Sequence, residues 1–158
     1  MIISTMNYTF TPGPGQYNAF GPDGPFPAWC AEKGQYLTFG EPIEYTFVDG
    51  VDAWGIAMSH TLDQLMSFAS TPGWLDTAAK SAAVQNDIWG ILAGHTGKLD
   101  VSGTPITVHA SQLHNPTRQD LLVTQAVPEP GLLALLGIAL LLVWRFSREK
   151  GEAHTAGV

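Results

Sequence analysis

The chain has 158 residues with a formal net charge of −7, and 45% of them are hydrophobic. This predicts one modest domain plus a tail. Because phosphate binding needs clustered Lys and Arg, and the chain holds only seven such residues, we exclude nucleic acid as a partner. The single cysteine, Cys30, excludes an intramolecular disulfide and zinc sites built on several cysteines.

The first half of the body predicts short strands between turns. The 17 Gly and 11 Pro of the chain favour such an architecture over a helical bundle. Residues 1–27 are rich in Gly, Pro and Asn, and we expect loops with short extended pieces there. Residues 36–39 and 43–48 have the composition of strands, and residues 53–58 are a candidate for a third.

Two helices are expected next in the chain. The first covers residues 62–69 with Thr61 as a candidate cap, and the second runs from a cap at Asp76 to about residue 93. Gly94 closes the second helix. Two further strands are expected at residues 106–110 and 121–123, with a turn at residues 115–116.

The second helix carries a polar residue where apolar ones are expected. At 100° per residue, Gln85 falls near the middle of the apolar arc, which also contains Trp89, while Asp87 falls on the polar arc. An unpartnered buried carboxamide costs about 1–3 kcal/mol, so Gln85 needs a partner. Either a hydrogen bond to a strand backbone or a covalent bond would meet this need.

The sequence around Gln85, VQNDIW, resembles the glutamine motif of bacterial thioester domains, and Trp29-Cys30 fits the position of their upstream cysteine. The resemblance implies that the Cys30 thiol displaces ammonia from the Gln85 amide and leaves an internal thioester. Asp87 departs from the motif, which usually has Ala there. The alternative is the same fold with Cys30 and Gln85 hydrogen-bonded but unlinked.

The tail contains an unbroken apolar run at residues 131–144. As a helix this run spans about 21 Å, against roughly 30 Å for a bilayer core, so it crosses only with Phe146 included and flanking arginines snorkelling. Arg145 and Arg148 follow the run, and by the positive-inside rule residues 145–158 are expected in the cytoplasm and the body outside. The alternative is a buried core helix.

The residues before this run, Pro128-Glu129-Pro130, complete a pattern that resembles the PEP-CTERM sorting signal. The resemblance implies export in a Gram-negative bacterium, insertion of residues 131–146 in the inner membrane, and processing by an exosortase. Phe146 and Ser147 separate Arg145 from Arg148, whereas the family commonly has adjacent arginines. Residues 1–15 have neither the basic nor the apolar region of a secretory signal, so we expect the true start to differ.

Together these features predict an α+β protein: a small antiparallel β-barrel or sandwich with two inserted helices, then a linker and a transmembrane sorting helix. The expected parts are a thioester-like domain at 1–124, the sorting signal at 125–150 and a cytoplasmic tail at 151–158. We expect a surface or matrix protein that attaches to an unknown surface ligand and needs no cofactor or metal. A non-reactive structural or binding module is the first alternative, and a secreted hydrolase the second.

Overall fold

The structure, a computed structural model, describes residues 5–12, 17–21, 24–35 and 37–127, and also Leu136, Ile138 and Leu140. The chain divides into two compact units, Met1–Val127 and Pro128–Val158. The first unit is α+β, with six strands and three helices among its described residues. Its strands are β1 (Thr5–Pro12), β2 (Tyr17–Gly21), β3 (Gly24–Cys30), β4 (Ile43–Asp49), β5 (Val108–His114) and β6 (Leu121–Ala126).

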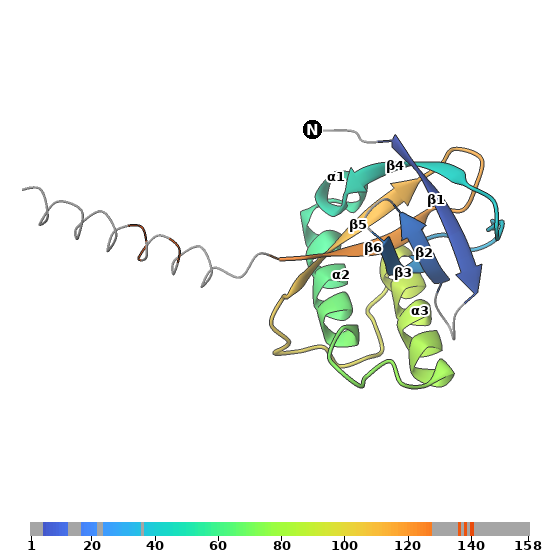
Figure 1. The fold of residues 1–158 in the computed structure, drawn as a ribbon. Coiled ribbons are helices and arrows are strands. Elements are labelled where there is room, and N and C mark those ends of the chain that lie inside the picture. Colours follow the sequence, from blue (N-terminus) through green and yellow to red (C-terminus); the bar gives the residue numbers. More distant parts are fainter. Residues whose placement is uncertain are drawn as a thin grey trace, which may run out of the picture. The chain divides into compact units, whose positions relative to one another are not determined.

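The strands form a closed antiparallel barrel in the order β1-β2-β3-β6-β5-β4 (Figure 1). β1 closes it by pairing with β4, where Met6 lies opposite Tyr45. Closure gives each of the six strands two neighbouring strands. The last strand continues to Ala126, so the body extends past the expected boundary at residue 124.

Residues 1–27 were expected to form loops with short extended pieces, and the extended part is larger than that, because β1, β2 and the first residues of β3 lie there. Threonine and aromatic residues favour pleated backbone, and in β1 the larger residues alternate with Thr and Asn. The strand predicted at residues 36–39 is wrong, since residues 37–39 have no regular structure and residue 36 lies outside the described residues.

Three helices, instead of the two expected, connect β4 to β5: α1 (Gly50–Trp54), α2 (Ile56–Ala69) and α3 (Ala78–Leu92). The candidate strand at residues 53–58 is therefore helical. Asp49 does more than end β4, because its side chain accepts a hydrogen bond from the Val51 N–H and caps α1. Gly55, with a φ of 80°, separates α1 from α2.

The first predicted helix, at residues 62–69, is the second half of α2, which begins at Ile56, whereas the ends of α3 are within about two residues of the predicted ones. Thr61 lies inside α2, where its hydroxyl donates to the Ala57 carbonyl at 3.0 Å, so it is not a cap. Thr77, and not Asp76, caps α3 by accepting from the Lys80 N–H. The prediction for Gly94 is confirmed, since this residue follows α3 with a φ of 82°.

The pattern of buried residues shows two apolar cores, one on each side of β3. Adjacent side chains of a strand point to opposite faces. Ala28 therefore belongs to one core, here called the first core, and Trp29 to the other, here called the second core. The second core lies where α2 and α3, side by side in Figure 1, pack against the barrel. The first core comprises Ala19, Ala28, Ile43, Tyr45, Leu113, Leu121 and Val123.

The buried face of α3 confirms one prediction and corrects two. Gln85 is buried, at 9% exposure. Asp87 is buried as well, contrary to its predicted polar arc, because the chain after α3 folds over it and the Lys98 and Leu99 N–H groups donate to its carboxylate at 2.7–2.9 Å. Trp89, which lies on the predicted apolar arc and was therefore expected to be buried, is only half-buried.

The last two strands are confirmed with longer or shifted bounds. The strand predicted at residues 106–110 is β5, displaced toward the C-terminus, and that predicted at residues 121–123 is the first half of β6. The turn predicted at residues 115–116 is present, with the Thr117 N–H donating to the Asn115 side chain at 2.8 Å.

The predicted sorting signal lies outside the described residues, and this includes Pro128, Glu129, Pro130, Arg145 and Arg148. In the described part of the chain, no helix combines the length and apolar character that crossing a membrane requires. Three residues of the predicted membrane run, Leu136, Ile138 and Leu140, are helical and exposed.

Candidate functional site

The structure brings Gln85 of α3 against Cys30 at the end of β3. The Cys30 N–H donates to Gln85 Oε1 at 2.9 Å, and Gln85 Nε2 donates to the Cys30 carbonyl at 2.8 Å. Both hydrogen bonds are buried, and 55 residues of chain separate their partners. The carboxamide thus satisfies both polar backbone groups of one strand residue, which explains its place on the apolar face of α3.

The sheet leaves this backbone free for Gln85. Cys30 lies opposite Leu121 of β6, but the neighbouring Ala31 donates to the Asp120 carbonyl there, at 2.9 Å. Backbone groups of successive residues in an antiparallel pair point alternately toward and away from the partner, so those of Cys30 point away from β6. On that side, the pairing of β2 with β3 among the described residues runs from Gly21, opposite Gly24, to Tyr17, opposite Ala28.

The thiol of Cys30 lies on the barrel side of β3. Its sulfur donates to the Tyr17 hydroxyl at 3.4 Å, and Tyr17 packs against the barrel core. Burial raises the pKa of the Cys30 thiol, while hydrogen bonds to Tyr17 and Gln119 lower it in part. Burial, with the neighbouring thiol, also raises the pKa of Tyr17 to about 12, so the phenol keeps its proton at neutral pH.

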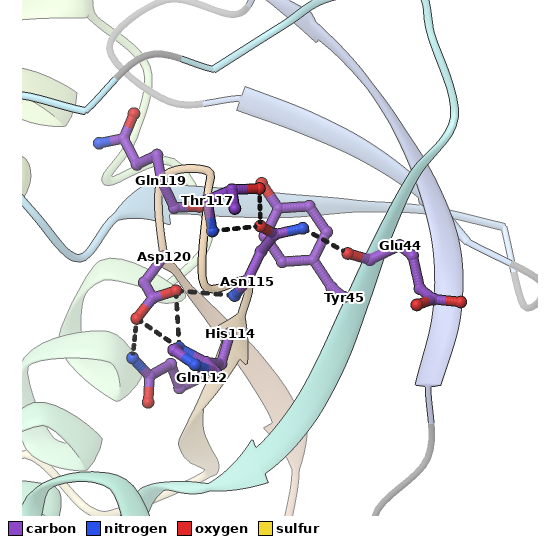
Figure 2. A network of polar contacts seen from close by, with 8 residues as sticks. All are labelled: Glu44, Tyr45, Gln112, His114, Asn115, Thr117, Gln119 and Asp120. Atoms are coloured by element: carbon purple, nitrogen blue, oxygen red, sulfur yellow. Dashed lines mark hydrogen bonds and ion pairs between the residues drawn. The ribbon is translucent and has the colours of Figure 1, made fainter.

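The turn that carries Gln119 is held by a buried carboxylate, which Figure 2 shows. Asp120 accepts from Gln112 Nε2 at 2.7 Å and from the Asn115 N–H at 2.9 Å, and it pairs with His114 Nδ1 at 2.9 Å. Asp120 is only 5% exposed, and these groups offset the cost of burying its charge. The Gln119 side chain projects away from this carboxylate in the figure.

Gln119 connects this turn to the segment after Cys30. Its carbonyl accepts from the Tyr45 hydroxyl at 3.0 Å, and its Nε2 donates to the Glu32 carbonyl at 2.8 Å. Its buried side chain is therefore fixed beside the Cys30 thiol. The Asp120 network thus acts as a scaffold for the surroundings of the sulfur.

A pocket of about 430 Å³ opens beside the Cys30–Gln85 pair. Ala31, the neighbour of Cys30 in the chain, and Trp89, one helical turn after Gln85, both line it. The Lys33 ammonium lies 5.0 Å from the centre of the Trp89 ring, in the geometry of a cation–π contact. The pocket therefore reaches the residue after Cys30 and the helical turn after Gln85, but neither member of the pair lines it.

The histidines on β5 form pairs with aspartates. His109 contacts Asp63 at 2.8 Å, and Asp63 also accepts from the Ala110 N–H at 2.7 Å, which ties α2 to β5. His114 belongs to the Asp120 network in Figure 2. Among the residues that the structure describes, no group of three or more His, Cys, Asp or Glu side chains could hold a metal ion.

The sequence pointed to Cys30 and Gln85, which the structure places in contact, but it gave no sign of Tyr17 or Gln119. Tyr17 falls in the stretch expected to be loops, and Gln119 lies in a turn between short strands. Only the barrel, which joins β2, β3 and the β5–β6 turn, brings these two side chains to the sulfur.

No protein-family model, no curated protein and no solved structure matches this chain.

Proposed function

We propose that this chain is an exported surface or matrix protein whose body attaches covalently to an amine of a surface ligand through a thioester between Cys30 and Gln85. The observation that carries the proposal is the pair of hydrogen bonds between the Gln85 carboxamide and the Cys30 backbone. They hold an acyl group against the backbone of the residue that carries the only thiol of the chain, and both residues are buried.

Formation of the thioester is a simple exchange. The Cys30 sulfur bonds to the Gln85 amide carbon, the carbon–nitrogen bond breaks, and the nitrogen leaves as ammonia with the thiol proton. The Cys30 N–H, 2.9 Å from Gln85 Oε1, is placed to stabilise the oxyanion of the tetrahedral intermediate. Because burial raises the pKa of the thiol, we expect this step to be slow at neutral pH.

Attachment consumes the thioester. A primary amine bonds to the Gln85 carbon, the carbon–sulfur bond breaks, and the Cys30 thiol is released with a proton from the amine. The pocket beside Ala31 and Trp89 gives such an amine a route to the pair. Each molecule reacts once, so the protein is an attachment module and not an enzyme.

The intact mass of the purified full-length chain tests this proposal. We expect it to be lower than the sequence mass by one ammonia, with Cys30 unreactive toward iodoacetamide. Methylamine should add its own mass and release a thiol that then alkylates. Cys30→Ala, which cannot form the thioester, should show its full sequence mass and should not react with methylamine. A wild-type chain of full sequence mass with a titratable thiol would refute the thioester.

A non-reactive module is the second candidate, and the same hydrogen bonds favour it. Gln85 Oε1 and Nε2 are both paired with Cys30, so the carboxamide already has a structural role without any chemistry. In this case the pair joins α3 to β3, and the body binds its ligand without a covalent bond. Full sequence mass in the experiment above is the result expected for this candidate.

Export and sorting form the second part of the proposal. It is supported by the prolines at 128 and 130, the apolar run after them and the arginines that follow. In a host with an exosortase, we expect a mature protein that ends near residue 130 and is absent from the cytosol. Mass spectrometry of the C-terminal peptide measures this, with an exosortase-deficient host as the control. A full-length soluble cytosolic form in the competent host would contradict it.

A further inference from the structure

We infer that Tyr17, assisted by Gln119, is the hydrogen-bond donor that stabilises the Cys30 sulfur as the leaving group when an amine opens the thioester. The inference rests on the proposed function, and it adds a residue in contact with the reacting sulfur that the sequence gave no reason to select. The juxtaposition that carries it is the 3.4 Å contact between the Tyr17 hydroxyl and the Cys30 sulfur.

The pairing of β2 with β3 in the barrel fixes the position of Tyr17. Tyr17 begins β2 and lies opposite Ala28, two residues before Cys30 on the same face of β3. Its ring is half-buried and lies 5.7 Å from the ring of Phe39, centre to centre. The hydroxyl is thereby directed at the sulfur from within the barrel, while Gln85 approaches the Cys30 backbone from α3.

The chemistry of the opening step needs such a donor. When the carbon–sulfur bond breaks, the electron pair goes to sulfur, and a buried thiolate is costly without hydrogen bonds. The Tyr17 hydroxyl, which accepts from the thiol in the unlinked state, can instead donate to the thiolate. Its pKa of about 12 keeps the phenol protonated, so it donates a hydrogen bond and the proton that reaches sulfur comes from the amine.

Tyr17→Phe tests the inference, because it removes the hydroxyl and keeps the ring. We expect the variant to form the thioester and to react with methylamine about 10- to 100-fold more slowly, the effect of one lost hydrogen bond to a charged group. After opening, its Cys30 thiol should alkylate with a midpoint at higher pH than in the wild type. A 3,5-difluorotyrosine at position 17, a stronger donor of the same shape, should react faster than wild type.

Ser67→Ala is the matched control. It removes a buried hydroxyl that accepts from the Thr107 N–H at 2.9 Å, away from the sulfur, so its methylamine rate should match the wild type. A wild-type rate for Tyr17→Phe in chains that have lost ammonia would overturn the inference and leave the proposed function intact. A wild-type chain of full sequence mass would overturn both. If Tyr17→Phe does not fold, an unchanged rate with difluorotyrosine overturns the inference on its own.

Discussion

Replacing Trp29 by Ala should lower the free energy of unfolding by about 3–5 kcal/mol, the range found for large aromatic truncations in cores. Trp29 is 1% exposed and packs among the side chains where α2 and α3 meet the barrel. Its loss leaves a cavity between a strand and two helices, which rigid elements fill poorly. Urea denaturation in a Cys30→Ala background, where no thioester contributes, measures the change.

Trp89→Ala is the matched control, because it makes the same change of side chain on α3 instead of β3. Because Trp89 is half-buried, contacts Lys33 and lines two pockets, we expect a loss of only about 1 kcal/mol. Equal losses for the two variants would mean that α3 packs on the barrel with a different face.

The helical part of this fold was accessible from the sequence because its signals are local. The 3.6-residue period and Gly94 placed α3 to within two residues at either end, and the same period put Gln85 on the buried face. It failed for Trp89, which is only half-buried, and for Asp87, whose burial depends on the chain after α3. The backbone at Lys98 and Leu99 donates hydrogen bonds to Asp87. The periodicity of α3 cannot predict a contact made by residues outside the helix.

The barrel was less accessible because its closure is long-range. β1 pairs with β4, more than thirty residues later, and a strand whose neighbours are unknown looks like any short Thr-rich and aromatic segment. The alternation of Met6, Tyr8 and Phe10 with smaller polar residues was the available signal for β1. Conversely, residues 53–58 have the composition of a strand but are helical apart from Gly55. Asp49 caps the start of α1, and Gly55 lies at the start of α2.

The candidate site also has a part that the sequence predicted and a part that depends on the tertiary fold. Cys30 and Gln85 were found because a buried amide on an apolar arc needs a partner and because a motif suggested which one. How they meet was not predictable, since the hydrogen bonds use the Cys30 backbone and not its side chain, and no helical or strand period indicates that. Tyr17 and Gln119 depend on the barrel and on the Asp120 turn in Figure 2, so no local pattern marks them.

Replacing Gln85 by Leu should cost roughly 2–5 kcal/mol of stability even where no thioester is possible. Leu keeps most of the side-chain volume but leaves the Cys30 N–H and carbonyl buried without their partners, and each unpaired group costs about 1–3 kcal/mol. The comparison is Cys30→Ala against Cys30→Ala with Gln85→Leu, because the Cys30 backbone is the same in both. Denaturation curves give the difference, and an equal stability of the two would show that the hydrogen bonds contribute nothing.

Gln85→Glu in the same Cys30→Ala background adds a dependence on pH with a defined sign. A protonated carboxyl accepts from the Cys30 N–H and donates to the Cys30 carbonyl, as the amide does, whereas the ionised form faces that carbonyl without a proton. Burial and the hydrogen bond of the neutral form both raise the pKa of this carboxyl in the folded state above its unfolded value of about 4.3. Below that value the variant should be nearly as stable as its Gln85 parent, and the stability should be lost as the pH rises through the folded pKa. A loss of stability on acidification relative to the parent would mean that the carboxyl does not face the Cys30 carbonyl.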